Sequence, residues 1–283
     1  MRLSAKSKFI LIVGDPVSHS LSPAMHNAAY ERLGIDDQFV YLGADVKIEN
    51  LEKVVSAMRV MDNFYGLTCT IPHKVEVIRY LDWIDETAKK IGAVNTVVKK
   101  NGLLCGYNTD WLGAVIPLEK ITSLKGKKVL VLGAGGAARA IVYGLVKKGS
   151  LVYILNRTLE RAINLAEEFK VEVLNFNQEK EIGNFDVIIN ATPVGMEPFQ
   201  NETPFNTKYI EKSQIVFDIV YTPSKTKLLK EAGKKGAKII YGLEMLLYQG
   251  VAQFEIYTGL KAPVEVMREI LNEKLKNKND NEK

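Results

Sequence analysis

The stretch KKVLVLGAGGAA, residues 127–138, is the part of the sequence that indicates the fold most clearly. Its first half is a short apolar run typical of a buried strand, and its second half has the pattern G-x-G-x-x-A expected between a strand and a helix in dinucleotide-binding domains. Gly133 permits a tight turn, Gly135 lets the backbone approach a pyrophosphate, and the small Ala138 allows close packing of helix on strand. Free N–H groups at the helix start favour anions, so the candidate cofactor loop is Gly133, Ala134, Gly135, Gly136 and Ala137.

The end of the next apolar run indicates which dinucleotide would bind. An NAD site typically has an acidic side chain about twenty residues after the glycines, which accepts a hydrogen bond from a ribose hydroxyl. Here residues 151–155 lead instead into Asn156, Arg157 and Thr158, with Arg161 one helical turn further on. Two cations and a hydroxyl suit a 2′-phosphate, so we expect NADP(H). The alternative is that the two arginines are solvated residues at a helix start, with Thr158 as the cap.

Short apolar runs alternate with helical patterns along the whole chain, which favours βαβ units and mainly parallel sheets. At roughly 150 residues per domain, 283 residues predict two α/β domains, with a boundary near 115–125. Strands are expected at 9–13, 39–42, 66–70, 94–98, 128–132, 151–155, 186–190, 215–219 and 238–241, and helices at 22–33, 47–61, 243–258 and 263–276.

Composition excludes several functional classes. Hydrophobic residues make up 47% and charged residues 25%, as in ordinary globular proteins. The net charge of +5 comes from scattered basic residues, and no recognition helix or aromatic–basic strand pattern points to nucleic acid. Two cysteines without CxxC spacing suit a reducing compartment, and no apolar run is long enough for a membrane span. We therefore expect a cytoplasmic protein; the three histidines lack partners at metal-ligand spacing, so no metal is expected.

Four polar clusters stand where the predicted strands of the first domain end. They are residues 14–27, with Ser18 and Ser20; residues 70–74, with Lys74; residues 92–96, with Asn95; and residues 106–110, with Asp110. Each has a structural interpretation: Ser-Pro and Asp110 can cap helices, Asn95 can stabilise a turn, and a single lysine is more often a surface residue. Ligand sites in open α/β sheets nevertheless lie at strand carboxyl ends, where we expect all four clusters.

Nine stretches together give the chain a close resemblance to the shikimate dehydrogenase family over nearly its whole length. In chain order they are SHSLSPAMHN, TCTIPHK, IGAVNT, GYNTD, GAGGAARA, NRTLERA, NATPVGM, DIVYTP and MLLYQG. The resemblance implies an NADP-dependent oxidoreductase that reduces the C3 ketone of 3-dehydroshikimate to shikimate, a step of aromatic amino-acid biosynthesis. It also implies a three-layer α/β/α substrate domain, residues 1–115 with 243–283, and a Rossmann NADP domain, residues 116–242, with the active-site cleft between them.

The resemblance assigns roles residue by residue. Lys74 and Asp110 match the catalytic pair, in which the lysine passes a proton to the alkoxide formed at C3 and the aspartate orients its ammonium group. The positions that bind substrate are Ser18, Ser20, Thr70, Asn95, Asp110, Tyr221 and Gln249. The cofactor positions are residues 133–137, Asn156, Arg157, Thr158, Arg161, Ile219 and Gly242, with Glu86 as a weaker one. The expected partners are small molecules, with the chain a monomer or homodimer.

One position departs from the family's pattern. The family's strand usually reads Asn-Val-Thr where this chain has Thr68, Cys69 and Thr70, and a hydroxyl lacks the donor and acceptor pair of an amide. The sequence therefore does not decide whether Thr68 contacts a ring hydroxyl of the substrate. It also leaves undecided whether the protein prefers shikimate to quinate. Competing hypotheses are a broader quinate/shikimate dehydrogenase and a non-catalytic NADP(H)-sensing protein; the presence of both Lys74 and Asp110 favours the enzyme.

Overall fold

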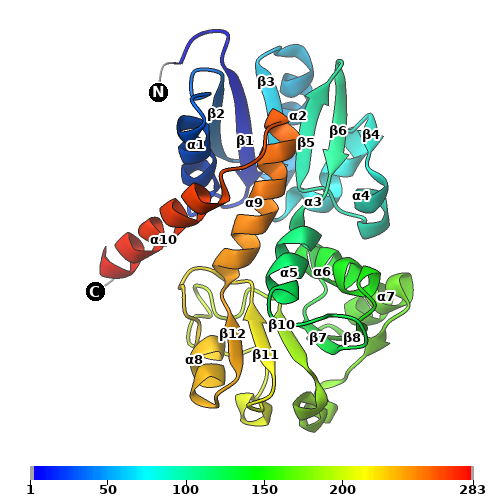
Figure 1. Ribbon diagram of the computed structural model, residues 1–283. Coiled ribbons are helices and arrows are strands. Elements are labelled where there is room, and N and C mark those ends of the chain that lie inside the picture. Colours follow the sequence, from blue (N-terminus) through cyan, green and yellow to red (C-terminus); the bar gives the residue numbers. More distant parts are fainter. Residues whose placement is uncertain (1–2, 282–283) are drawn as a thin grey trace. The chain divides into compact units, whose positions relative to one another are not determined.

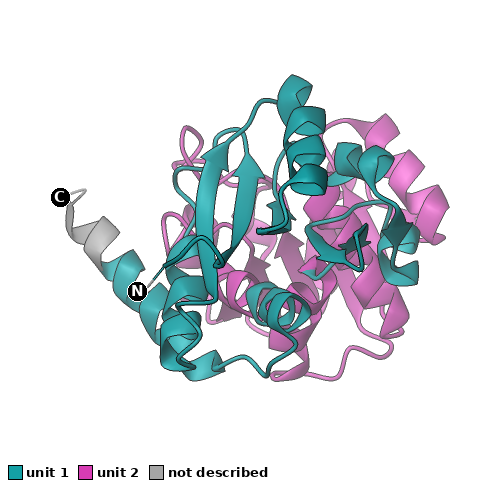
Figure 2. Ribbon diagram, turned by 90° about the horizontal axis from the view of Figure 1, so that it is seen from above, with its two compact units in different colours: residues 1–109, 249–283 teal, residues 110–248 magenta. Residues whose placement is uncertain are grey.

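The computed structural model describes residues 3–281, with side chains from 3 to 276. The chain divides into two compact units, Met1–Thr109 with Gln249–Lys283 and Asp110–Tyr248, which Figure 2 colours separately. The first unit is therefore discontinuous in sequence, and the chain returns to it inside a helix. The domain limits expected from the resemblance, 115 and 243, lie inside the helices at which the chain passes between the units.

The first unit is a six-stranded sheet covered by helices (Figure 1). Its strands are β1 (Lys8–Gly14), β2 (Phe39–Asp45), β3 (Phe64–Cys69), β4 (Trp83–Ile84), β5 (Thr96–Lys100) and β6 (Leu103–Tyr107). Its helices are α1 (Ser22–Arg32), η1 (Ile48–Asn50), α2 (Leu51–Val60), α3 (His73–Glu76), η2 (Val77–Tyr80), α4 (Glu86–Ile91) and α10 (Val264–Asn281), together with the second part of α9 (Gly242–Thr258).

The strands of this sheet lie in the order β2-β1-β3-β5-β6-β4. All run in the same direction except β5, which is antiparallel to both β3 and β6, so the expectation of a mainly parallel sheet is confirmed. The reversal comes from the hairpin at Asn101 and Gly102, whose φ angles of 51° and 80° are both positive. Asn-Gly is the strongest short sequence signal for a two-residue hairpin turn.

Helices cover both faces of the first sheet, which makes three layers. Side chains alternate along β3: Cys69 lies in a buried cluster with Leu51 and Val55 of α2, whereas Thr68 contacts Tyr257 of α9 on the other face. Helix α1 packs against α9 on that second face, where the methionine side chain of Met25 occupies the space a Cβ on Gly250 would need. Each face thus buries its own apolar layer.

The second unit is a parallel sheet of six strands, again with helices on both faces. Its strands are β7 (Lys128–Leu132), β8 (Leu151–Leu155), β9 (Glu172–Val173), β10 (Val187–Asn190), β11 (Ile215–Asp218) and β12 (Lys238–Ile240). Its helices are α5 (Asp110–Glu119), α6 (Gly136–Lys147), α7 (Leu159–Phe169), η3 (Phe176–Asn184), η4 (Thr207–Tyr209) and α8 (Lys227–Lys234), with the first turns of α9.

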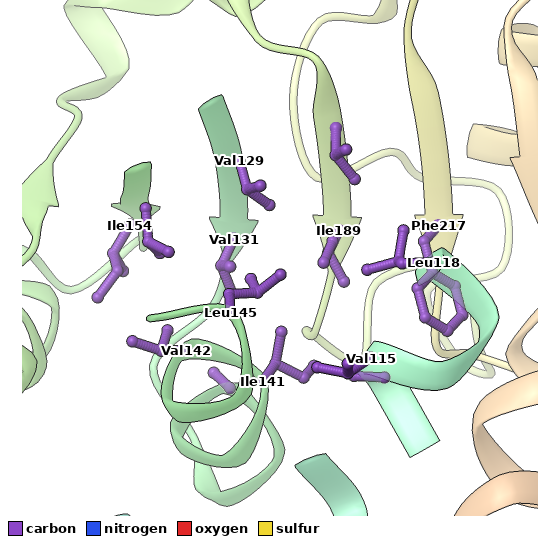
Figure 3. Close-up of a cluster of buried hydrophobic side chains, with 14 of the residues drawn as sticks. Val115, Leu118, Val129, Val131, Ile141, Val142, Leu145, Ile154, Ile189 and Phe217 are labelled. Carbon is purple, nitrogen blue, oxygen red and sulfur yellow. The ribbon is translucent and has the colours of Figure 1, made fainter. Parts of the chain in front are cut away.

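Strand order β12-β11-β10-β7-β8-β9 makes this unit a Rossmann fold, with the order reversing between β7 and β10. Figure 3 shows the apolar layer beneath one face, where Ile141 and Leu145 of α6 and Val115 of α5 meet Val131 and Ile189 of the sheet. This packing presents the start of α6 at the carboxyl end of β7. The expected fold class, two α/β parts of which the second is a Rossmann domain, is confirmed. No helix among the described residues is both long and apolar enough to cross a membrane.

Candidate active site

Three of the four predicted polar clusters, and residues 106–109 of the fourth, lie at one edge of the first unit's sheet, whereas Asp110 begins the second unit. Because β1, β2, β3 and β6 run in the same direction, their carboxyl ends share that edge. Backbone hydrogen bonds continue beyond the strands: Thr70 N donates to Val13 O at 2.9 Å, and Asp15 N donates to Ile71 O at 3.0 Å. Across β5, Cys69 N donates to Asn95 O at 2.9 Å. The clusters from widely separated parts of the sequence are thus bound to one another.

The placement of Asn95 corrects one expectation. All four clusters were expected at strand carboxyl ends, but Asn95 directly precedes β5, the one antiparallel strand, and so stands at an amino end. Its N–H donates to Tyr107 O, at the end of β6, at 3.0 Å. Asn95 still lies at the same edge of the sheet as the other clusters. Because β5 is antiparallel to its neighbours, its amino end lies beside their carboxyl ends.

Ser18 and Ser20 occupy the turn between β1 and α1. Ser18 is exposed, and Ser20 is half-buried with its hydroxyl oxygen accepting from Ser22 N at 3.3 Å. Val17 N donates to the Asp45 carboxylate at 2.5 Å, which ties this turn to the end of β2. Two hydroxyls beside a helix start form a site suited to a carboxylate.

Thr70 and Lys74 follow β3. A Cβ on Gly14 would lie 2.5 Å from the methyl carbon of Thr70, so only glycine lets the ends of β1 and β3 approach this closely. Lys74, in the single turn of α3, is half-buried, and its carbonyl accepts from Val94 N at 2.7 Å. Burial raises the pKa of the Cys69 thiol to about 12, and the charge of Lys74 acts in the opposite direction.

Asn95 is the centre of a buried hydrogen-bond network. Its Oδ1 accepts from Thr109 N at 2.9 Å and from the Thr96 hydroxyl at 2.7 Å, while its Nδ2 donates to the Thr109 hydroxyl at 2.9 Å. A backbone N–H can only donate, so the orientation of the amide is fixed. Its donor end, Nδ2, is then the end suited to a ligand oxygen. The network also holds Thr109, and Asp110, 3% exposed, is the next residue.

Gln249 lies in α9, in the part that belongs to the first unit, and is 8% exposed. Gln253, one turn later on the same helix face, donates from Nε2 to the Thr96 hydroxyl at 3.0 Å. Sequence reasoning named neither Gln253 nor Thr96 and Thr109. Their positions in the sequence could have indicated them. Gln253 lies one helical turn after Gln249, Thr96 follows Asn95, and Thr109 precedes Asp110.

In the second unit, the glycine loop has the backbone that a dinucleotide needs. Gly133 has φ +110°, and its N–H donates to Leu155 O at 2.8 Å. A Cβ there would lie 3.0 Å from Ala191 O, whereas a Cβ on Gly135 would meet nothing within 4 Å, so the loop is open where a pyrophosphate would approach. Gly135 caps α6 without a side chain, which leaves its first N–H groups accessible to an anion.

The end of β8 presents cations. Asn156 Nδ2 donates to Thr158 O at 2.8 Å, which shapes the turn before α7. Arg157 and Arg161 are exposed, and neither has an acidic partner among residues 3–276. Two uncompensated guanidinium groups beside the glycine loop fit a 2′-phosphate, so the residues present suit NADP(H).

Ile219, Tyr221 and Gly242 gather at the ends of β11 and β12. A Cβ on Gly242 would lie 2.5 Å from Ile219 O, so α9 begins in direct contact with the segment after β11. Tyr221 is half-buried, and burial raises its pKa to about 12. These three positions form one surface of the second unit.

A buried polar network lies at the carboxyl ends of β10 and β11. It was not predicted from the sequence. Asp218, at the end of β11, accepts from Asn190 Nδ2 at 2.9 Å, from Val220 N at 3.1 Å and from the Thr226 hydroxyl at 2.6 Å. Burial raises the pKa of Asp218 to about 6, although the hydrogen bonds oppose the shift. The stretches NATPVGM and DIVYTP were recognised as motifs, and the network explains why Asn190 and Asp218 occur in them.

Glu86 and Thr68 are the two remaining positions that the sequence singled out. Glu86 is exposed on α4 of the first unit and pairs with Lys89 at 2.7 Å, while the glycine loop belongs to the second. Thr68 is only 4% exposed, and its hydroxyl is bonded to the hydroxyls of Tyr41 and Tyr257. Within the described residues, no group of three His, Cys, Asp or Glu side chains could hold a metal ion.

The chain matches three family descriptions that together cover most of its length. Residues 12–97 match the shikimate dehydrogenase substrate binding domain, residues 117–225 match shikimate / quinate 5-dehydrogenase, and residues 242–271 match the shikimate 5'-dehydrogenase C-terminal domain. The order of the three agrees with the division of the chain into a discontinuous unit and a central one.

Similar proteins match from end to end. A shikimate dehydrogenase (NADP(+)) of Methanococcus maripaludis is 46% identical, over 97% of this chain and 99% of that protein. A crystal structure of a shikimate dehydrogenase in complex with NADP+ is 41% identical with a TM-score of 0.91, covering 96% of this chain and 97% of the other. The Thermus thermophilus shikimate 5-dehydrogenase, solved in complex with NADP(H) and shikimate, is 37% identical with a TM-score of 0.87, covering 94% and 99%.

Proposed function

The chain belongs to the shikimate dehydrogenase family, and from this we propose that it reduces 3-dehydroshikimate reversibly to shikimate with NADPH. It is an NADP-dependent oxidoreductase that acts on a CH–OH group, in the pathway to the aromatic amino acids. The observation that carries the proposal is the shared sheet edge at which Lys74, Asn95 and Thr109 meet. Residues of these types at one edge can bind a polyhydroxylated acid and move a proton.

Substrate binding is assigned to seven residues. Ser18 and Ser20 hold the carboxylate of the substrate, because their hydroxyls flank the start of α1. The ring hydroxyls, and further contacts to the carboxylate, are assigned to Thr70, Asn95, Asp110, Tyr221 and Gln249. The saturated Oδ1 of Asn95 supports a role for its amide as a hydrogen-bond donor to a ring hydroxyl.

The cofactor is assigned to the second unit. Residues 133–137 take the pyrophosphate, Asn156 to Arg161 take the adenosine ribose and its 2′-phosphate, and Ile219 and Gly242 lie near the nicotinamide. When bound, NADPH supplies the hydride that C3 receives. Arg157 is the residue that separates NADPH from NADH, because its fork of donors matches a phosphate. We retain Glu86 as a weaker cofactor position. The alternative is that Glu86 serves only to form its ion pair with Lys89.

The protein's own chemical step is a proton transfer. As C3 of the ketone gains hydride, its oxygen gains charge, and Lys74 donates a proton to that oxygen. In the oxidative direction, Lys74 takes the proton of the C3 hydroxyl back while the hydride on C3 passes to NADP+. Asp110 orients the ammonium group of Lys74 and the hydroxyl of the substrate. The Asn95–Thr109 hydrogen bonds support this role, because they hold the backbone immediately before Asp110.

The proposed setting is the cytoplasm. Cys69 and Cys105 are both buried and unpaired, which suits a reducing compartment. All residues assigned to the reaction come from a single chain, so activity is expected of a monomer as well as of a homodimer.

An absorbance assay at the nicotinamide band tests the proposal. The purified chain is supplied with 3-dehydroshikimate and NADPH, and in the reverse direction with shikimate and NADP+. The expected result is turnover in both directions, with NADP+ preferred over NAD+. Absence of turnover in every combination, with NADPH binding retained, would contradict the proposal and favour a non-catalytic NADP(H)-sensing protein.

Quinate is the second candidate substrate, because the family description matched by residues 117–225 names both shikimate and quinate. The same assay with quinate and NADP+ or NAD+ decides between a strict and a broad enzyme. We expect shikimate to have the larger kcat/KM, since the arginines after β8 favour NADP+ and the substrate positions match the family's shikimate set.

A further inference from the structure

Helix α9 carries three buried polar side chains spaced four residues apart. Gln249, Gln253 and Tyr257 are 8%, 0% and 1% exposed, and their spacing places them on one helix face. We call these three residues the α9 stripe. Only Gln249 has a role in the proposed function; the other two lie progressively further from the site edge along the same helix. Figure 1 shows α9, in orange, beside the strands of the first unit.

Gln253 is connected to the substrate residue Asn95 through one hydroxyl. Its Nε2 donates to Thr96 Oγ1 at 3.0 Å, and Thr96 Oγ1 in turn donates to Asn95 Oδ1 at 2.7 Å. Gln253 Nε2 also lies 3.5 Å from Asn95 O. Because the amide can only donate through Nε2, the Thr96 hydroxyl must direct its own proton at Asn95. Gln253 therefore helps to fix which end of the Asn95 amide meets a ligand.

Tyr257 is connected to the sheet through Thr68. The two hydroxyls lie 2.8 Å apart, and the Tyr41 hydroxyl donates to the same Thr68 oxygen at 2.6 Å. A Cβ on Gly66 would lie 2.6 Å from the Tyr257 ring, so the glycine lets the ring lie directly on β3. The Thr68 hydroxyl is thus engaged by two buried tyrosines, which leaves it unsuited to binding a substrate hydroxyl.

We propose that Gln253 and the Thr68–Tyr257 pair are positioning residues for substrate binding, which hold the α9 stripe against β3 and β5 so that Gln249 and Asn95 meet the substrate in the correct orientation. This inference rests on the proposed function and adds the residues that set its substrate affinity. Position 68 then acts on affinity from a distance, through α9. Both connections lie in the first unit, so the effect is confined to the substrate and leaves NADP+ binding unchanged.

The test at Gln253 uses Gln253→Leu, which keeps the approximate volume and removes the amide. We expect the KM for shikimate to rise about tenfold, as for the loss of an orienting buried hydrogen bond, with kcat and the KM for NADP+ nearly unchanged. Phe254→Leu is the matched control, because Phe254 is buried on the same turn and packs against Tyr30 and His26 instead. An equal rise in the KM for shikimate in both variants would show a purely structural effect and overturn the proposal.

The test at Thr68 compares Thr68→Val with Thr68→Ser. The valine removes the hydroxyl and keeps the shape, whereas the serine keeps the hydroxyl, so we expect a severalfold rise in the KM for shikimate with valine and near wild-type values with serine. Shikimate-induced protection against thermal unfolding supplies a readout independent of turnover. If Thr68→Val binds shikimate like the wild type, the proposal is wrong. Failure of the wild type to oxidise shikimate would instead refute the proposed function, so the two failures are distinguishable.

Discussion

Gly133 lies so close to the backbone of Ala191 that a Cβ would stand 3.0 Å from the Ala191 carbonyl oxygen. The two residues follow β7 and β10, the neighbouring strands between which the strand order reverses. That switch point is where ligands bind in open α/β sheets. The φ of +110° at Gly133 and this close approach together explain why the fingerprint requires glycine here.

Gly133→Ala should therefore weaken NADPH binding. The alanine is strained by about 1–3 kcal/mol and pushes the loop away from Ala191, so we expect the Kd for NADPH to rise about tenfold or more. Gly149→Ala is the matched control, since Gly149 also has a positive φ, +78°, but ends α6 with only ordinary contacts. Both variants should lose stability, and only Gly133→Ala should lose affinity in a titration of NADPH fluorescence. Equal affinities would place the pyrophosphate elsewhere.

Arg157→Ala should narrow the preference for NADPH over NADH. A charge-assisted hydrogen bond to phosphate contributes about 1.5–3 kcal/mol, so the KM for NADPH should rise about tenfold to a hundredfold while that for NADH changes little. Lys230→Ala, which removes another exposed cation from the same unit, controls for net charge. An unchanged ratio of kcat/KM for the two cofactors would show that Arg157 does not hold the 2′-phosphate.

His26 should make the protein sensitive to acid. The imidazole is fully buried and stacks on Tyr41 with ring centroids 4.3 Å apart; burial lowers its pKa to about 3, and Gln253 opposes this shift. Because the unfolded chain binds the proton near pH 6.5 and the folded protein does not, stability falls as the pH drops below 6.5, by about 1.4 kcal/mol per pH unit. Urea unfolding at pH 7 and pH 5 should show this loss in the wild type and a smaller one in His26→Phe. Identical losses would mean that other groups cause the acid sensitivity.

Asp218 should have the opposite dependence on pH. Burial raises its pKa to about 6, so between pH 4 and 6 the folded protein holds a proton that the unfolded chain has released. Stability from this group is therefore greatest at low pH and falls, by about 3 kcal/mol in total, as the pH rises through 6. In Asp218→Asn the dependence disappears, so the variant's stability relative to the wild type should increase from pH 4 to pH 7. A constant difference across that range would contradict the raised pKa.

Most of the second unit could be predicted from the sequence, because its signals are local, although β9 and α8 were not predicted. The strand, the glycines and the start of α6 lie within twelve consecutive residues, and Arg157 follows the next strand directly. The predicted strands at 128–132 and 151–155 have the bounds of β7 and β8. The identity of the family was predicted from motifs of the same local kind.

The first unit could be predicted only in part, because its arrangement depends on contacts between distant residues. The strand β6 was missed, although Asn101 and Gly102 form the hairpin signal that precedes it. One partner of Thr68 is Tyr257, 189 residues away, and no local pattern reveals such a pair. The polar network at Asp218 was missed for a related reason, since a buried carboxylate looks like a helix cap or a turn in sequence.

Lys74 is expected to supply the proton in the reduction of 3-dehydroshikimate by NADPH. The most direct measurement compares kcat for this reaction, together with the Kd for NADPH, in the wild type, in Lys74→Ala and in Lys90→Ala, whose lysine is exposed on α4 of the same unit. We expect turnover by the wild type and Lys90→Ala, and a loss in kcat of about a hundredfold or more in Lys74→Ala with the Kd for NADPH unchanged. Turnover by Lys74→Ala within a few-fold of the wild type would contradict this expectation.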